Sequence, residues 1–215
     1  MTSLINQDRR EHWQTVYQNK GESQTSWFRP HLDESLRLID ALALAPGTPI
    51  IDVGGGRSTL VDDLLARGFR DLTVLDLSPA ALEASRVRLD ANGDSVTWLA
   101  GDITATALPE ARFGLWHDRA VFHFLTDEAD RRRYVAQAAR AIRPGGYAII
   151  ATFAADGPEK CSGLPVCRYD ATQLAAEFAS GFTCVDSSRE VHRTPFETDQ
   201  AFTYVVLCRH APGSA

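Results

Sequence analysis

Apolar residues recur at helical spacing through the first 45 positions of the chain. Trp13, Val16 and Tyr17 lie three and four residues apart, and Leu32 and Leu36 begin a second set with the same spacing. Such spacing places each set on one face of a helix. The sequence therefore predicts two helices joined by the turn-rich segment KGESQTSWFRP, which together form a helical N-terminal cap.

From position 46 onwards, short apolar runs alternate with segments of helical periodicity. Runs of this length bounded by turn residues are typical of buried strands. The expected strands are PIIDV (49–53), LTVLDL (72–77), VTWLAGD (96–102), FGLWHD (113–118), YAIIATF (147–153), FTCVDSSREVH (182–192) and AFTYVVLCR (201–209). The expected helices span residues 58–68, 78–89, 126–142 and 170–180.

Capping residues mark the starts of three of these helices. Ser78 precedes Pro79, which suits the first helical position because proline lacks an N–H there. Thr126 precedes a first turn rich in acids, and Asp170 with Gln173 forms the spacing of a capping box. We therefore expect these residues to fix where the helices begin.

The alternation of strands and helices predicts a parallel sheet that is covered on both faces. Right-handed crossovers then lead to an open, doubly wound α/β arrangement. The last two strands are joined only by the short loop RTPFETDQ, so the final strand must run antiparallel to its neighbour. We expect a seven-stranded sheet, mostly parallel, in a single domain over residues 1–215, with its core at 46–210.

Composition excludes several classes of protein. The 215 residues carry a net charge of −6, which disfavours a general binder of nucleic acid or of acidic membranes. The N-terminus lacks the apolar run of a signal peptide, and no stretch approaches the length of a membrane helix. Four cysteines without a CxxC pair indicate free thiols in a reducing compartment, so we expect a cytoplasmic protein.

Acidic residues and glycines gather where the predicted strands end. Asp52 and the glycines at 54–56 follow the first strand, and Asp76, Asp102 and Asp118 end the next three. Ligands of doubly wound sheets bind at the carboxyl ends of the strands. We therefore expect a ligand site rimmed by four carboxylates and a glycine loop.

The charge of this rim discriminates between cofactors. The dinucleotide fingerprint G-x-G-x-x-G is incomplete, because position 59 is Thr. Several carboxylates would also repel a pyrophosphate, whereas they attract the sulfonium and ammonium groups of S-adenosylmethionine. Asp76 lies 22 residues beyond Gly54, about where an acid that holds ribose hydroxyls is expected.

Taken in order, these motifs resemble those of the class I S-adenosylmethionine-dependent methyltransferases. IIDVGGGRS resembles motif I, LTVLDLS the ribose-binding acid, LAGDIT the adenine-binding acid, LWHDRAVFHFL motif IV, and IRPGGYAIIATF the loop before strand five. The resemblance implies a Rossmann-like core with S-adenosylmethionine as cofactor and no metal. The cofactor-binding residues expected from it, and from the aromatic segment before it, are Asp52, Gly54, Gly55, Gly56, Asp76, Leu77, Asp102, Ile103, Asp118 and Trp27.

Two narrower groups share further features. HDRAVFHFLTDEADRRRYVAQ and HWQTVY…SWFRP are similar to thiopurine and thiol methyltransferases. The N-terminal pattern is also similar to a group of seven-strand protein-lysine methyltransferases. Their usual D-K-G-T step after strand four is replaced here by DRAVFH. The sequence therefore favours a small-molecule acceptor over a protein lysine.

Candidate catalytic groups follow the fourth strand. We interpret His123 as a base or acceptor-orienting group, and His117 and Arg119, which also flank Asp118, as further candidates. Arg119 could stabilise a thiolate or bind an acidic acceptor. Trp27 and Phe28 lie in a polar loop and suit a lid, where an aromatic face attracts a sulfonium.

Cys161 and Cys167 follow the fifth strand and bracket a Gly-Leu-Pro turn. Two thiols at this edge could bind a soft metalloid, although uninvolved free thiols are the simpler interpretation.

The sequence thus predicts a methyltransferase that acts on a small thiol or amine by in-line displacement. Protein-lysine methylation, an NAD-dependent oxidoreductase and a non-catalytic cofactor-binding module are the alternatives. A protein acceptor stays possible, no nucleic acid or membrane partner is expected, and the oligomeric state is open. We also expect the first 30 residues to close over the bound cofactor.

Overall fold

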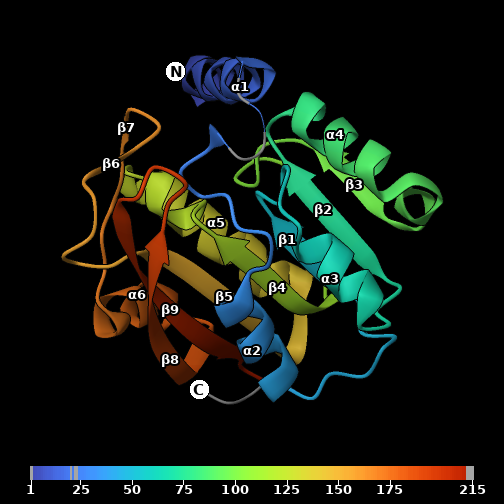
Figure 1. The fold of residues 1–215 in the computed structure, drawn as a ribbon. Coiled ribbons are helices and arrows are strands. Elements are labelled where there is room, and N and C mark those ends of the chain that lie inside the picture. The colour runs from blue at the N-terminus through green and yellow to red at the C-terminus, as the bar shows by residue number, and fades with distance from the viewer. Residues whose placement is uncertain (1, 20, 22–23, 212–215) are drawn as a thin grey trace.

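A seven-stranded sheet forms the centre of the computed structural model, which describes residues 2–19, 21 and 24–211 (Figure 1). The strand order is β3-β2-β1-β4-β5-β9-β8. The strands of this sheet are β1 (Ile50–Val53), β2 (Leu72–Asp76), β3 (Thr97–Ala100), β4 (Phe113–Arg119), β5 (Ile142–Phe153), β8 (Phe182–Arg193) and β9 (Asp199–Arg209).

Strands β1 to β5 pair in parallel, and β9 runs antiparallel to both β5 and β8. The predicted seven-stranded, doubly wound sheet with a reversed last strand is therefore confirmed. From β1 the chain adds strands on one side as far as β3, and it then returns to add β4 on the other side of β1. The carboxyl ends of β1 and β4 therefore flank the switch point, where ligands bind in such sheets.

Helices cover both faces of the sheet (Figure 1). Ile50 and Ile51 are neighbours on β1, and the pleat points them into opposite core clusters. The Ile50 cluster takes up the apolar sides of α2 (Asp33–Ala41), α3 (Leu60–Ala66) and α4 (Pro79–Leu89). The Ile51 cluster takes up those of α5 (Glu128–Ala141) and α6 (Ala171–Phe178).

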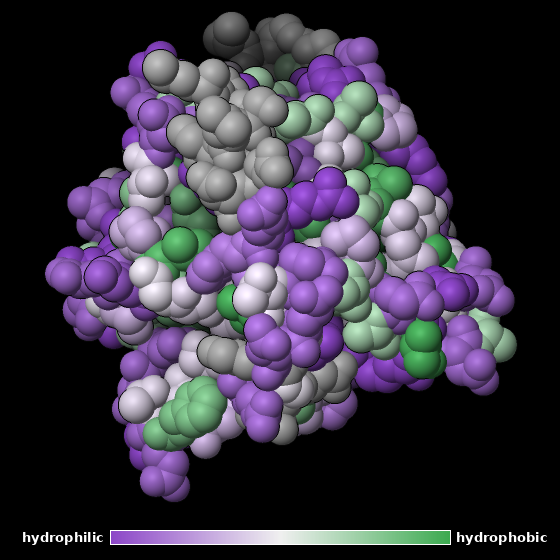
Figure 2. Space-filling model, turned by 90° about the horizontal axis from the view of Figure 1, so that it is seen from above, coloured by the Kyte–Doolittle hydropathy of each residue, from purple (hydrophilic) through white to green (hydrophobic). Residues whose placement is uncertain are grey.

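The first helix, α1 (Thr2–Asn19), lies above the carboxyl ends of the parallel strands (Figure 1). The two helices of the predicted cap therefore occupy different places, since α2 belongs to a core layer through Leu36 and Ile39. Seen from above, this side of the molecule is mostly hydrophilic, with small hydrophobic patches (Figure 2). None of the described helices combines the length and apolar character that crossing a bilayer requires.

Two of the three predicted helix starts are confirmed. The Ser78 side chain accepts a hydrogen bond from the Ala81 N–H, and Asp170 forms a capping box with Gln173. The expected cap at Thr126 is wrong. Asp127 occupies that position, because its carboxylate accepts from the N–H groups of two residues in the first turn of α5.

Short elements complete the fold. Two 3-10 helices are η2 (Asp90–Ser95) and η3 (Phe122–Phe124). A small hairpin consists of β6 (Lys160–Cys161) and β7 (Leu164–Pro165). Strand β5 starts at Ile142, five residues before the predicted strand, and the Pro-Gly-Gly segment lies at an irregularity in its pairing with β4, where Gly145 has a positive φ of 72°.

Candidate active site

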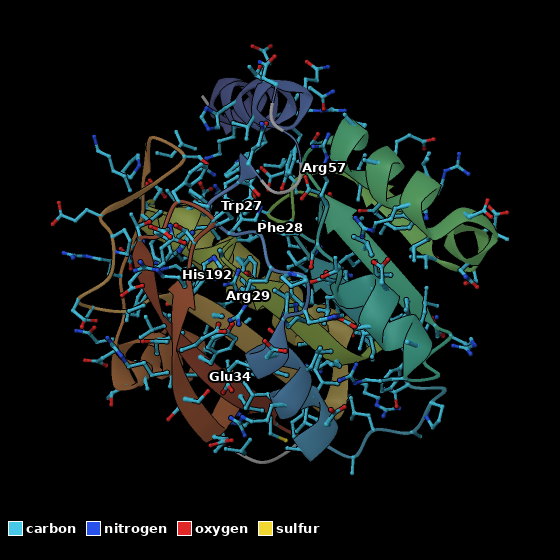
Figure 3. All side chains as sticks on the ribbon, viewed as in Figure 1. Trp27, Phe28, Arg29, Glu34, Arg57 and His192 are labelled. Atoms are coloured by element: carbon cyan, nitrogen blue, oxygen red, sulfur yellow. The ribbon has the colours of Figure 1, made fainter. Side chains whose placement is uncertain are left out.

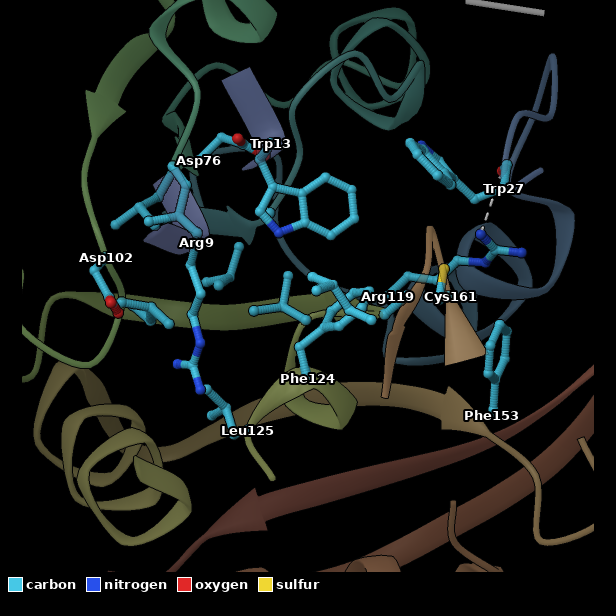
Figure 4. Close-up of a pocket in the computed structure, with 18 of the residues that line it drawn as sticks. Arg9, Trp13, Trp27, Asp76, Asp102, Arg119, Phe124, Leu125, Phe153 and Cys161 are labelled. Atoms are coloured by element: carbon cyan, nitrogen blue, oxygen red, sulfur yellow. Dashed lines mark hydrogen bonds between the residues drawn. The ribbon is translucent and has the colours of Figure 1, made fainter. Parts of the chain in front are cut away.

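A cavity of about 200 Å³ lies beneath α1 at the carboxyl ends of the strands. Its lining comes from segments far apart in the sequence. Asp76 and Asp102 lie toward one end of it, and Arg119, Phe153 and Cys161 lie toward the other (Figure 4). A smaller cavity of about 50 Å³ adjoins it and is lined by Asp52, Gly55 and other residues of the glycine loop.

The glycine loop after β1 has φ angles that favour glycine, and it packs too closely against its neighbours to leave room for side chains. Gly54 and Gly56 have positive φ angles of 70° and 44°, which favour glycine. A Cβ added at Gly54 would lie 2.0 Å from Cγ2 of Val121. One added at Gly56 would lie 2.7 Å from the hydroxyl oxygen of Tyr17. The loop backbone therefore packs closely against its protein surroundings at Gly54 and Gly56.

Asp76 lines the cavity and is only 6% exposed. Its Oδ1 accepts a hydrogen bond from the Ser78 N–H at 2.8 Å. Burial raises the pKa of the Asp76 carboxyl to about 7, the Ser78 N–H opposes this shift, and nearby Asp52 adds to it. The carboxyl can therefore change its charge near neutral pH.

Asp102 lines the same end of the cavity as Asp76. Its Oδ1 accepts from the N–H and hydroxyl of Thr104, both at 2.7 Å. Its Oδ2 is buried and has no hydrogen-bond partner among the described residues. Because an unsatisfied buried acceptor is costly, this atom suits a ligand that brings an N–H donor.

The remaining predicted cofactor residues divide into two groups. Leu77, Ile103 and Trp27 line the main cavity, and Trp27 lies toward the end that holds Arg119. Asp118 does not line either cavity, because its carboxylate faces α5. It accepts from the N–H groups of Val121 and Phe122 at 2.8 and 3.0 Å and from the hydroxyl of Tyr134. Burial raises the pKa of Asp118 to about 6.

His117 is buried away from the main cavity, 1% exposed. Its Nδ1 lies 2.7 Å from Oδ1 of Asp52, and its Nε2 lies 2.9 Å from the hydroxyl of Ser35 on α2. Of the two cavities, His117 lines only the smaller one, and its catalytic role stays a prediction. Its two ring nitrogens are both used inside the protein.

His123 is fully buried in η3 and does not line either cavity. Its ring packs against Phe124 and Phe153, with centroids 4.4 and 4.8 Å away, and its Nδ1 accepts from the Phe153 N–H at 3.3 Å. Burial, assisted by the charge of Arg119, lowers its pKa to about 3. The structure thus places this candidate base behind the aromatic wall as a neutral ring.

Arg119 is the predicted catalytic candidate that does reach the cavity. Its Nε donates to the hydroxyl of Tyr204 at 3.1 Å, and its guanidinium lies 4.3 Å above the Phe202 ring. Nη2 is buried without a hydrogen-bond partner in the described chain, and the nearest carboxylate oxygen, on Glu190, is 3.9 Å away. This cation therefore has capacity for another partner.

The loop between α1 and α2 is fastened to the sheet beside this cavity. His192 donates from Nε2 to the Ser26 carbonyl at 2.8 Å, and Arg29 pairs with Glu190. Burial lowers the pKa of His192 to about 4, so its ring is neutral at physiological pH. Figure 3 shows Trp27 and Arg29 on this segment near His192.

Sequence reasoning missed several residues of the cavity. Arg9, Trp13 and Tyr17 are spaced four residues apart, so they share one face of α1, and all three line it. Gln200 also lines it from the start of β9, and its Oε1 is buried without a partner among the described residues. The four-residue spacing could have identified the α1 face.

None of the four cysteines forms a disulfide bond. Cys161 lines the cavity, whereas Cys167 does not, and its N–H donates to the His123 carbonyl at 2.8 Å. Within the described ranges, no group of three His, Cys, Asp or Glu side chains is placed to hold a metal ion.

Comparison with known proteins gives consistent matches. Residues 50–146 match a family described as "Methyltransferase domain". EEF1A lysine methyltransferase 2 of Homo sapiens is 21% identical over 191 residues, covering 82% of this chain and 75% of the relative. Relatives described as eEF1A lysine and N-terminal methyltransferases are much longer, and the chain spans about a fifth of their length.

Solved structures share the fold over nearly the whole chain. A structure described by the words "Conversion of a Disulfide Bond into a Thioacetal Group during Echinomycin Biosynthesis" has a TM-score of 0.75 at 22% identity, covering 96% of this chain and 94% of that chain. The 1,6-didemethyltoxoflavin-N1-methyltransferase of Burkholderia thailandensis, with 1,6-didemethyltoxoflavin and S-adenosylhomocysteine bound, has a TM-score of 0.70 at 20% identity, covering 98% of this chain and 89% of that chain.

Proposed function

We propose that this chain, which is an S-adenosylmethionine-dependent methyltransferase with the class I fold, methylates a small molecule at a thiol or amine. The observation that carries this proposal is the distribution of charge along the cavity. Its two lining carboxylates, Asp76 and Asp102, lie at one end, where Arg9 is paired with Asp130, and Arg119 is at the other end.

The acidic end fits the adenosine part of the cofactor. The unpartnered Oδ2 of Asp102 is suited to accept an N–H of adenine, with Ile103 beside the ring. Asp76 is suited to accept ribose hydroxyls. Gly54 brings backbone to the cavity wall at the switch point, where a methionine moiety would meet it. We assign Asp52, Gly55 and Gly56 the role of shaping this loop and Asp118 that of fixing the turn after β4.

The other end is suited to a flat or apolar acceptor. Trp27, Phe153 and Phe202 provide aromatic surface there, and Arg119 and Gln200 provide buried polar groups. No carboxylate lines this end among the described residues. The neighbouring carboxylate of Glu190 is already shared by Arg29 and Arg119, so a lysine ammonium would add to an excess of positive charge. A neutral amine, a thiol or a thiolate would avoid that cost.

The chemistry demands little of the protein besides positioning. The cofactor supplies a methyl group on a positively charged sulfur. Arg119 would stabilise an anionic nucleophile, because a neighbouring cation lowers the pKa of a thiol. His123 and His192 are poor bases at neutral pH, since their pKa values are lowered to about 3 and about 4. We infer that the acceptor reaches the site already deprotonated or with a free lone pair.

Protein-lysine methylation is the second candidate. It is supported by the names of the relatives, which methylate the elongation factor eEF1A according to those names. Their identity with this chain is 29% or less. The aromatic wall and the cation at the acceptor end favour the small molecule.

A radiolabelled transfer assay separates these candidates. Purified protein is incubated with methyl-labelled S-adenosylmethionine and either a panel of aryl and alkyl thiols and amines or purified eEF1A. We expect label in the small-molecule fraction, thiols first. Label only in precipitated protein would overturn the proposal in favour of lysine, and no transfer to any acceptor would favour a non-catalytic cofactor-binding module.

Two variants connect the assay to the cavity. Arg119→Gln should lower kcat/KM for a thiol about tenfold or more, because it removes the charge that favours the thiolate. S-adenosylhomocysteine affinity should stay unchanged. Arg193→Gln is the matched control, since Arg193 is exposed and pairs with Asp199 outside the cavity. An equal loss in both variants would contradict the role of Arg119.

A further inference from the structure

An ion pair fastens the N-terminal helix over the acidic end of the cavity. Nη1 of Arg9 on α1 lies 3.1 Å from Oδ2 of Asp130 on α5. The two side chains are only 20% and 8% exposed, so the pair is shielded from solvent. Asp130 also accepts from Arg133, which fixes the carboxylate from its own helix. This carboxylate therefore holds Arg9 in a defined position.

Arg9 lines the cavity in addition to its ion pair with α5. Figure 4 shows its side chain running between Asp102 and Leu125, at the end assigned to adenosine. Trp13 and Tyr17 follow Arg9 at intervals of four residues and line the same cavity. One face of α1 is therefore part of the cavity wall.

Other contacts already anchor α1 near its C-terminal half. The hydroxyl of Ser78 donates to Oε1 of Gln14 at 2.7 Å, and Arg57 donates from Nη2 to the Tyr17 carbonyl at 2.7 Å. The position of α1 thus has support that is independent of Arg9. A guanidinium that is held by one carboxylate and faces a ligand cavity retains donors and a flat face for that ligand.

We propose that Arg9 binds the adenine ring of the cofactor and that Asp130 is the positioning residue that orients it. Guanidinium groups stack on aromatic planes, and adenine offers both a plane and ring nitrogens that accept hydrogen bonds. Asp102 and Arg9 then provide complementary groups, an acceptor and a donor, at one end of the cavity. This proposal concerns the cofactor alone and is independent of the acceptor.

Calorimetric titration tests the proposal with two ligands that share adenosine. S-adenosylhomocysteine carries the methionine moiety, whereas 5′-methylthioadenosine lacks its amino and carboxylate groups. Arg9→Ala should weaken both ligands by about tenfold, in the range expected for a desolvated cation–π contact. Arg10→Ala is the matched control, because Arg10 is the next residue and is exposed. It should bind both ligands like the unaltered protein.

Further variants separate binding from anchoring. Arg9→Lys keeps the charge near Asp130 but loses the planar group, so it should recover less than half of the lost binding energy. Asp130→Asn should weaken both ligands less than Arg9→Ala does. Unchanged affinity for methylthioadenosine in Arg9→Ala would overturn the proposal, and so would full rescue by lysine. Thermal unfolding of each variant verifies that the fold is retained.

Discussion

Nδ1 of His117 lies 2.7 Å from Oδ1 of Asp52, and both side chains are buried on the α2 side of the sheet. The two residues are register partners on the adjacent parallel strands β1 and β4. Ser35 on α2 completes the arrangement at Nε2 of the imidazole. A Cβ added at Gly55 would lie 2.6 Å from Oδ2 of Asp52, so the pair of His117 and Asp52 packs directly against the glycine loop and supports it.

We therefore predict that His117→Ala impairs stability more than chemistry. Removing the imidazole leaves the Asp52 carboxylate buried without its partner, which costs about 3 kcal/mol of unfolding free energy. Ser35→Ala should cost about 1 kcal/mol, since it removes one hydrogen bond. Urea unfolding measures both values. Unaltered stability with a large loss of kcat would instead make His117 a catalytic residue.

The start of α5 offers a prediction with a built-in control. The carboxylate of Asp127 accepts from the N–H groups of Ala129 and Asp130, so Asp127→Ala should destabilise the protein by about 1 kcal/mol. Thr126→Ala should change the unfolding free energy by a few tenths of a kcal/mol at most. A larger loss in the threonine variant would mean that the helix begins one residue earlier.

This difference shows what the sequence can specify at helix ends. Thr126 and Asp127 are both good capping residues and adjacent, so composition alone cannot choose between them. Ser78 was identified correctly because Pro79 fixes the first helical position. The order of strands was predictable for a similar reason, since strand–helix alternation and crossover handedness leave few arrangements.

Sequence reasoning placed the residues at strand ends in the cavity correctly only where the side chain lies on the cavity side of the sheet. Asp76 and Asp102 line the cavity, whereas Asp118 and His117 belong to β4 and point to opposite faces of the sheet. The pleat of the strand decides to which face each side chain points, and a shift of one position along the strand reverses that face. His123 could not be judged from sequence, because its burial depends on the rings of Phe124 and Phe153 packing over it.

Gly54 provides a test of the loop itself. Its φ of 70° and the 2.0 Å approach of an added Cβ to Val121 leave no room for a side chain. Gly54→Ala should therefore weaken S-adenosylhomocysteine binding by more than about tenfold, as the loop shifts to relieve the clash. Gly163→Ala is a matched control, because its φ is also positive while an added Cβ meets open space. It should share the backbone strain but retain cofactor affinity in a calorimetric titration.

The buried carboxyl of Asp76 predicts two opposite dependences on pH. Its pKa is raised to about 7 in the folded protein, against about 3.9 in an unfolded chain. The folded state therefore binds this proton more tightly, and the stability that Asp76 contributes without cofactor falls as pH rises from about 4 to about 7. The loss amounts to about 4 kcal/mol at most. Cofactor affinity should change in the other direction, because the ionised carboxylate is the better acceptor for ribose hydroxyls.

Unfolding and titration between pH 5 and 8 measure both trends. Asp118, whose pKa is raised to about 6, adds a stability trend of the same sign, so the comparison is made between the unaltered protein and Asp76→Asn. The asparagine variant should be more stable above pH 7, bind S-adenosylhomocysteine weakly, and lose the rise in affinity with pH. Asp94→Asn is the control, because that side chain is 77% exposed. A rise in affinity that persists in Asp76→Asn would show that another group controls cofactor binding.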